Sequence, residues 1–306
     1  MSTIISAIDV WLQTNSVSFA LKTTLRISCV VINVIILCFT LLKRKFRKDS
    51  FKNLFAQLAL GDLCIGLSSF VRQYSWDFES VNVLICSCMD VFTNIGFLLS
   101  QTAILFIAFE RFIAIFLPEQ FHRITSQKVI LYRWILTLVI SFIYSCLLFA
   151  RNDLNRVLTI CLMTVYWTDW FFAGFFALYG ALSFVILGIY STIIIAQKRL
   201  ASQSKTSRRV YYTCLYISII YVICWMFPKG AVLVFSKTEA PAVVNVLLRH
   251  SGILSNLMII TNFVIYGWRH QEIRMAILDF LYIFCKFCRT KTTRVTTLGS
   301  SHSGQR

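Results

Sequence analysis

The sequence predicts an all-α membrane protein, a bundle of seven transmembrane helices followed by a short amphipathic eighth helix. Hydrophobic residues make up 58% of the 306 residues and charged residues only 14%, whereas soluble domains carry roughly 25% charged residues. Apolar runs of about 20 residues, the length that spans a bilayer, recur along the chain. With 3 Pro and 11 Gly, these runs favour uninterrupted helices over the short alternating strands of a membrane β-barrel.

The predicted elements follow in order, and connections that carry charged residues bound each apolar run. We expect the spans at residues 24–42, 53–71, 84–109, 130–150, 169–196, 211–235 and 243–267. Residues 1–23 form a short N-terminal segment that lacks the basic start and compact apolar core of a signal peptide. The seven-helix domain thus covers 24–267.

Two segments follow the seventh span. Residues 268–288 have helical periodicity and a basic edge, which predicts an amphipathic helix and membrane anchor along the inner leaflet. Cys285 and Cys288 in this segment are suited to palmitoylation, with an unmodified pair as the alternative. Residues 289–306 are rich in Ser and Thr, which predicts a disordered cytoplasmic tail.

The basic residues determine the expected orientation. Of the 30 Lys and Arg residues, 22 lie in the connections 43–52, 111–133 and 198–209 and in the tail from 269 onward. The positive-inside rule therefore predicts that the N-terminus lies outside and the C-terminus lies on the cytoplasmic side. The net charge of +17 is juxtamembrane, so it indicates membrane lipid or a cytosolic partner and no nucleic acid.

Asp62 lies half-way through the second span, where an ionisable group is costly and therefore indicates function. Asn33, Ser100 and Asn262 lie at similar depth in the first, third and seventh spans. A carboxylate with several neutral oxygens suits a sodium ion or a protonation switch. An uncharged Asp62 that hydrogen-bonds between helices is an equally good interpretation.

Further landmarks occur in order along the spans. The third span ends in Glu110-Arg111-Phe112, where Arg111 taken alone is suited to reaching the lipid head groups. The ordered set is Asn33, Leu58-Ala59-Leu60-Gly61-Asp62, Cys86, Ser100, Glu110-Arg111-Phe112, Ala114-Ile115-Phe116-Leu117-Pro118, Trp134, Tyr190, Tyr221, Cys224-Trp225 and Asn262-Phe263-Val264-Ile265-Tyr266. Over about 240 residues, this set resembles the rhodopsin-like family of G-protein-coupled receptors, and its departures resemble divergent invertebrate chemosensory or orphan receptors.

The resemblance implies a receptor that transmits an extracellular ligand signal to a heterotrimeric G protein. In such a receptor Glu110 holds Arg111 until activation releases it into the G-protein interface. The residues implied in this switch are Glu110, Arg111, Phe112, Tyr190, Trp225, Asn262 and Tyr266. The resemblance also implies a disulfide between Cys86 and Cys161, although Cys88 is only two residues from Cys86, and arrestin binding to a phosphorylated tail.

Several positions depart from the family's pattern. Phe263 and Leu182 stand where the family has prolines in the seventh and fifth helices, so we expect the helix distortions of those prolines to be absent or produced otherwise. Pro228 lies three residues after Trp225 instead of two, and Met258 replaces a polar residue near the expected sodium site. These departures bear on activation more than on the fold.

The ligand is less well determined than the fold. Thr93 replaces the aspartate that binds amines, and residues 243–267 contain no lysine for retinal, so both ligands are disfavoured. We expect the pocket wall to consist of Asp90, Thr93, Asn94 and Phe97, with Trp225 at its floor. Arg72, Lys229, Arg249 and His250 either attract an anionic group at the mouth or are solvated.

Other classes of protein explain the sequence less well. No nucleophile–base pattern indicates an enzyme, and most of the 11 cysteines are scattered singly, so neither catalysis nor a metal site other than sodium is expected. A transporter built around Asp62 would show inverted repeats and broken spans, which are absent from the sequence. A receptor-like protein that does not signal, such as a scaffold, heteromer partner or scavenger, remains the main alternative.

Overall fold

The computed structural model contains two units, Met1–Asn262 and Phe263–Arg306, which are considered separately. The structure describes residues 16–42, 49–74, 80–150, 152–158, 161, 166–200, 205–236, 253–262, 265, 274–275 and 282. The predicted N-terminal segment, eighth helix and tail lie largely or wholly outside these residues. The fold below therefore concerns the first unit.

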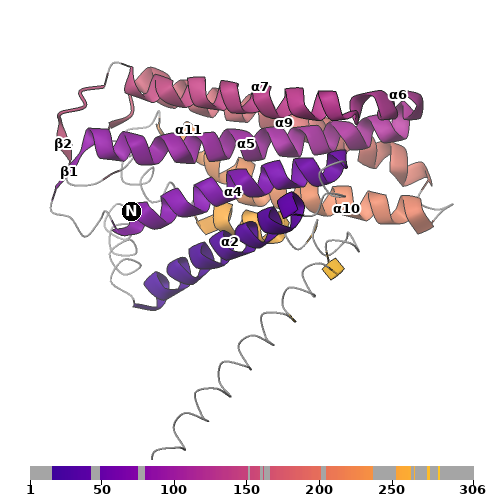
Figure 1. Cartoon of the computed structure of the whole chain (residues 1–306), viewed down its shortest axis with the longest axis horizontal. Helices are drawn as coiled ribbons and strands as arrows, with labels where there is room; N and C mark the ends of the chain where they lie inside the picture. Colours follow the sequence, from indigo (N-terminus) through magenta and orange to yellow (C-terminus); the bar gives the residue numbers. More distant parts are fainter. Residues whose placement is uncertain are drawn as a thin grey trace, which may run out of the picture. The chain divides into compact units, whose positions relative to one another are not determined.

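Long helices dominate the first unit (Figure 1). They are α2 (Ser16–Leu42), α4 (Ser50–Tyr74), α5 (Val83–Phe116), α7 (Gln127–Cys146), α9 (Asp169–Leu200), α10 (Lys205–Tyr221) and α11 (Phe227–Ser236). The short elements are α6 (Pro118–Ile124), the 3₁₀ turn η2 (Leu147–Phe149), the π-helical turn η3 (Val222–Met226) and the strands β1 (Val81–Asn82) and β2 (Val157–Leu158). α5 packs against α4, α7 and α9.

Six of the predicted spans are present. Six helices within the described residues are long and apolar enough to cross a membrane, and they coincide with the first six predicted spans. Of the seventh predicted span, 243–267, the structure describes mainly the apolar helix Ile253–Asn262. The protein is therefore a mostly helical, multi-span membrane protein.

α7 shows why these helices pack as a membrane bundle. Its buried residues include the polar series Arg133, Thr137, Ser141 and Ser145, each four positions after the last. Residues four apart lie on one face of a helix, so this face turns its polar groups toward the protein. The large apolar side chains of the other face are exposed, as expected where lipid replaces water.

α5 begins and ends at residues whose chemistry explains its limits. The side chain of Asn82 accepts a hydrogen bond from the backbone nitrogen of Leu84 at 3.0 Å and caps the first turn. The helix stops at Phe116 because Pro118, two residues later, disfavours helical geometry at Leu117 and has no N–H to donate. α5 therefore extends seven residues beyond its predicted end at 109.

Two glycines allow α4 and α5 to approach closely. A Cβ on Gly61 would lie 2.6 Å from the backbone oxygen of Gly96 and 2.5 Å from Oγ of Ser100. A Cβ on Gly96 would lie 2.6 Å from the backbone oxygen of Gly61. Both positions thus exclude any side chain, and their contact brings Asp62 of α4 beside Ser100 of α5.

The departures from the receptor pattern have two different outcomes. α9 continues without a break through Leu182, so the distortion of a fifth-helix proline is absent. The sixth span instead contains the π-helical turn η3, with Trp225 inside it and Pro228 directly after it. Pro228 cannot donate a hydrogen bond to the carbonyl of Cys224, and a π turn is one way in which a helix accommodates such a loss.

Candidate functional site

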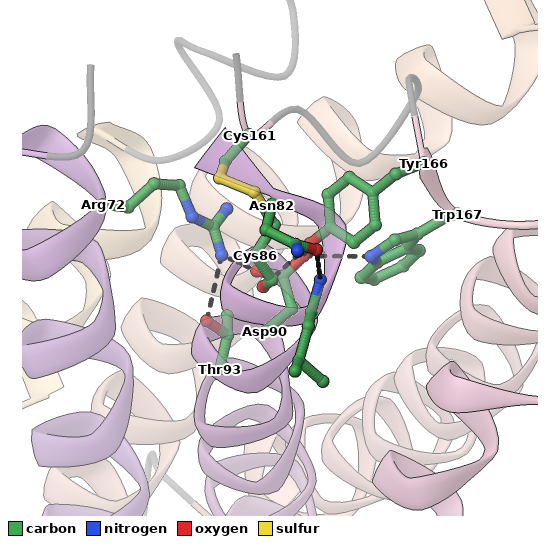
Figure 2. The surroundings of a disulfide bond; sticks show 9 residues. Arg72, Asn82, Cys86, Asp90, Thr93, Cys161, Tyr166 and Trp167 are labelled. Carbon is green, nitrogen blue, oxygen red and sulfur yellow. Dashed lines mark hydrogen bonds and ion pairs between the residues drawn. A yellow bond between two sulfur atoms is a disulfide. The ribbon is translucent and has the colours of Figure 1, made fainter. Parts of the chain in front are cut away.

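A disulfide ties the N-terminal end of α5 to the chain that leads into α9. Cys86 and Cys161 form this disulfide with their Cα atoms 5.5 Å apart, as the resemblance implied (Figure 2). β1 and β2 pair beside it, with Val81 opposite Leu158. Cys88 is free and exposed, so it does not compete for the bond. We call this end of the bundle the disulfide end.

Asp90 lies one turn below Cys86 and is fully buried. Figure 2 shows its carboxylate between Arg72 on one side and Tyr166 and Trp167 on the other. Arg72 forms an ion pair with Asp90, Trp167 donates from Nε1 at 2.9 Å, and the Tyr166 hydroxyl also donates to the carboxylate. Burial raises the pKa of Tyr166 to about 12, against the opposing effects of Arg72 and Trp167, so this hydroxyl keeps its proton near neutral pH.

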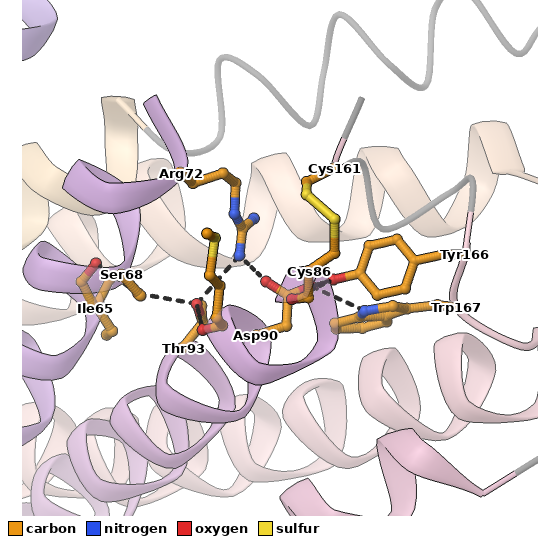
Figure 3. Close-up of polar contacts among 10 residues, drawn as sticks. Ile65, Ser68, Arg72, Cys86, Asp90, Thr93, Cys161, Tyr166 and Trp167 are labelled. Atoms are coloured by element: carbon orange, nitrogen blue, oxygen red, sulfur yellow. Dashed lines mark hydrogen bonds and ion pairs between the residues drawn. A yellow bond between two sulfur atoms is a disulfide. The ribbon is translucent and has the colours of Figure 1, made fainter. Parts of the chain in front are cut away.

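Thr93 belongs to the same polar cluster. It accepts a hydrogen bond from Arg72 at 3.2 Å and donates to Oγ of Ser68 at 2.9 Å (Figure 3). Asp90 and Thr93 were expected in a pocket wall, and in the structure the polar groups of both side chains contact other protein groups. Arg72 is likewise neutralised by Asp90 instead of standing free at the mouth.

Aromatic rings fill the bundle one to two turns further along α5. Phe97 contacts Trp225 with ring centroids 5.1 Å apart, Tyr179 at 6.1 Å and Phe175 at 6.2 Å. Nζ of Lys229 lies 4.3 Å from the Trp225 centroid and 4.5 Å from that of Phe97. α5, α9 and the η3–α11 segment thus meet at one aromatic cluster, where a ligand pocket was expected.

The polar core is smaller than the sequence suggested. Asp62 is buried and accepts a hydrogen bond from Oγ of Ser100 at 2.6 Å. Asn33 is also buried, but its side chain donates to the backbone oxygen of Cys29 in its own helix at 2.8 Å. Asn262 is buried without a described contact to Asp62. A carboxylate and a hydroxyl therefore meet here, which suits either a cation or a hydrogen-bonded neutral acid.

A second buried network links three helices one turn of α5 beyond Phe97. The Tyr221 hydroxyl donates to Oε1 of Gln101 and lies 2.8 Å from Oγ of Ser183. It thereby connects the end of α10 to α5 and α9. Tyr221 directly precedes the π turn that holds Trp225, so this network adjoins that turn.

At the opposite end of α5, the expected partner of Glu110 needs correction. Glu110 is buried and pairs with Arg133 of α7 at 2.7 Å, and Ser50 of α4 hydrogen-bonds to both. Arg111 instead lies over the Phe51 ring, 5.1 Å from its centroid. Adjacent residues on a helix point about 100° apart, so Glu110 faces α7 while Arg111 faces elsewhere.

The remaining expected switch residues are only partly described. Phe112 stacks on Phe116 at 4.6 Å, and Tyr190 of α9 is buried. Tyr266, Cys285 and Cys288 lie outside the described residues. No group of three or more His, Cys, Asp or Glu side chains that could hold a metal occurs in the part of the chain that the structure describes.

Sequence reasoning missed the residues that pair with the predicted ones. Tyr166 and Trp167 lie in a connection whose course the sequence does not determine. Arg133 was counted with a basic connection, although the polar series from Arg133 to Ser145 at intervals of four residues could have indicated a buried face. No feature of the sequence indicated that Ser50 contacts Glu110 and Arg133.

The described spans, the disulfide between α5 and the chain before α9, and the buried charged groups at both ends of α5 define a multi-span membrane protein built like a G-protein-coupled receptor. A comparison with protein-family models matches residues 27–281 to the family described as serpentine type 7TM GPCR chemoreceptor Srsx. The chain belongs to this family, whose members are described as receptors. The resemblance found in the sequence is thus confirmed at the level of serpentine receptors. No curated protein matches the chain.

Proposed function

We propose that this chain is a plasma-membrane chemoreceptor that transmits an extracellular chemical signal to a heterotrimeric G protein in the manner of rhodopsin-like receptors. The disulfide end is extracellular in this proposal, in agreement with the distribution of basic residues. The observation that carries it is the make-up of α5. One continuous helix bears the disulfide, the aromatic cluster and, at its other end, Arg111.

The signal passes from the aromatic cluster to the cytoplasmic end through the sixth span. A ligand that binds one arrangement of Trp225 better than another shifts the equilibrium between them. The π turn at Val222–Met226 interrupts the regular α-helix of the sixth span, and the hydroxyl of the preceding residue, Tyr221, hydrogen-bonds to Gln101 of α5. The outward movement of α10 then exposes Arg111 to the G protein.

Arg111 is already free of its neighbouring acid. Its described contact is with the Phe51 ring, and both side chains are half-buried. A cation–π contact contributes about 0.5–2 kcal/mol, depending on burial. The guanidinium can therefore leave Phe51 for a G-protein partner at small cost. Arrestin binding to the tail 289–306, palmitate at Cys285 or Cys288 and a sodium ion at Asp62 belong to the same proposal.

Basal signalling tests the proposed coupling without a known ligand. Wild type, Arg111→Ala and the control Arg156→Ala are expressed at equal surface levels beside a panel of G-protein dissociation reporters. Arg156 is exposed at the disulfide end, far along the chain from the coupling end of α5. We expect a basal signal in one channel that falls in Arg111→Ala alone. A basal signal above that of cells without the receptor, and equal in all three proteins, would contradict the role of Arg111 in coupling.

A further inference from the structure

Lys229 is a cation that lies among aromatic rings, and it has no acidic partner among the residues that the structure describes. Its Nζ is 4.3 Å from the Trp225 centroid, 4.5 Å from that of Phe97 and 5.8 Å from that of Phe175. The side chain is half-buried, and no ion pair or hydrogen bond joins it to another residue of the described structure. Contacts with rings partly offset the loss of water, but they leave the charge uncompensated.

Two further polar side chains at the aromatic cluster also have no hydrogen-bond partner in the described structure. Nε1 of Trp225 is buried and unpaired. Asn94 is fully buried, and both its Nδ2 and its Oδ1 are unpaired. Asn94 lies three residues before Phe97, on the same face of α5, and its backbone oxygen is 3.5 Å from the Tyr179 hydroxyl. Nε1 of Trp225 and the two side-chain polar atoms of Asn94 are thus three buried polar atoms without hydrogen-bond partners in the described structure at one cluster, which indicates that a partner is missing there.

The chemistry of these groups selects the missing partner. Lys229, Trp225 and the amide nitrogen of Asn94 are all donors, and only Oδ1 of Asn94 is an acceptor. Asp90, one turn before Asn94, cannot neutralise Lys229 because its carboxylate is occupied by Arg72, Tyr166 and Trp167. The cluster is therefore rich in donors and positively charged. A complementary ligand carries several acceptor oxygens and a negative charge.

We propose that Lys229, Trp225 and Asn94 form the binding site for the carboxylate of a small ligand whose apolar body packs on Phe97 and the rings of α9. This inference rests on the proposed receptor function and names the class of its ligand. A cationic ligand would bring a second positive charge beside Lys229. A neutral ligand would accept the hydrogen bonds but leave the charge of Lys229 uncompensated.

Thermal stability of the purified receptor measures such binding without a G protein, because a ligand that binds the folded state stabilises it. The probes are phenylacetate, 4-phenylbutyrate, indole-3-acetate and octanoate, each compared with its primary amide. We expect at least one carboxylate to raise the melting temperature of the wild type, and its amide to need at least a tenfold higher concentration for the same rise. Equal responses to acid and amide, or no response to any acid, would overturn the proposal.

Variants assign the response to the cluster. We expect Lys229→Gln to weaken the carboxylate response at least tenfold and Lys229→Arg to retain much of this response. The control Lys198→Gln should leave the response unchanged, because Lys198 is an exposed lysine at the end of α9 that lies away from Phe175. Asn94→Ala provides a second test if Lys229→Gln does not fold, with an expected loss of several-fold. A carboxylate response that both variants retain in full would contradict the assignment.

The binding and signalling experiments test the ligand site and the proposed function separately. Stabilisation by a carboxylate without coupling to any G protein would contradict the proposed function and support the site. Coupling that no carboxylate affects, together with a wild-type melting temperature unchanged by the probes, would contradict the site and leave the proposed function intact.

Discussion

Replacing Glu110 with glutamine should destabilise the receptor through Arg133 and not through Arg111. The Glu110 carboxylate is 2.7 Å from Nη1 of Arg133, and Nη2 of Arg133 is 2.6 Å from Oγ of Ser50. Glu110 and Arg133 are 5% and 8% exposed, respectively. Removing the carboxylate charge therefore leaves the guanidinium charge of Arg133 buried and uncompensated.

The size of the effect follows from this burial. Removing one member of a buried ion pair costs roughly 3–5 kcal/mol. Glutamine keeps an amide oxygen that accepts from Ser50 or Arg133, so we expect the lower end, about 3 kcal/mol of unfolding free energy. Adding Arg133→Met removes the stranded charge. The double variant should therefore be less destabilised than the sum of the single variants by about 2 kcal/mol.

A pair of double-mutant cycles measures this coupling. Unfolding free energies are obtained by denaturant titration in mixed micelles for Glu110→Gln, Arg133→Met, Arg111→Met and the two double variants that contain Glu110→Gln. We expect a large coupling between Glu110 and Arg133 and a coupling near zero between Glu110 and Arg111. A larger coupling to Arg111 would refute the reasoning and restore the ion pair implied by the sequence motif.

Three further predictions concern the packing, the polar core and the disulfide. Gly96→Ala should abolish surface expression because its Cβ would meet the backbone of α4 at 2.6 Å. The control Gly180→Ala has open space around it and should stabilise α9 by about 0.5–1 kcal/mol. Equal expression and stability of the two variants would refute the close approach of α4 and α5. Replacing choline chloride by sodium chloride should raise the melting temperature of the wild type but not of Asp62→Asn, and equal shifts would leave Asp62 as a hydrogen-bonding group only. Cys161→Ser opens a disulfide that spans 75 residues and should lower the free energy of unfolding by roughly 2–5 kcal/mol. Cys88→Ser should leave the stability unchanged. A larger loss of stability in Cys88→Ser than in Cys161→Ser would contradict the pairing of Cys86 with Cys161.

The spans were predictable because their signal is local. An apolar run of sufficient length predicts a membrane helix whatever its neighbours are, and the first six spans agree with the structure. The end of α5 was less predictable, since the sequence prediction stopped at the charged residues Glu110 and Arg111. The helix continues to Phe116 because Glu and Arg are good helix formers and the first residue that interrupts it is Pro118.

The partners within the site were not predictable, because they depend on how the helices pack. The motif that contains Glu110 and Arg111 suggests an ion pair between neighbours, but their directions on the helix send Glu110 toward α7. Asp90 was expected in a pocket wall of the third span, and the sequence contains no signal that Arg72 and Tyr166 contact its carboxylate. Lys229 was considered only as a residue at the mouth, because its proximity to Phe97 requires the sixth span to pack against α5.

Nucleotide exchange tests the proposed receptor function most directly. Purified wild-type receptor in lipid nanodiscs is mixed with each class of Gα and its βγ partner, with and without the carboxylate probes, and GTP analogue binding is followed. We expect one class of Gα to exchange faster than with empty nanodiscs, and Arg111→Ala of equal melting temperature to lose this effect. A folded wild type that accelerates exchange on no class of Gα under either condition would contradict the proposal that this chain is a G-protein-coupled chemoreceptor.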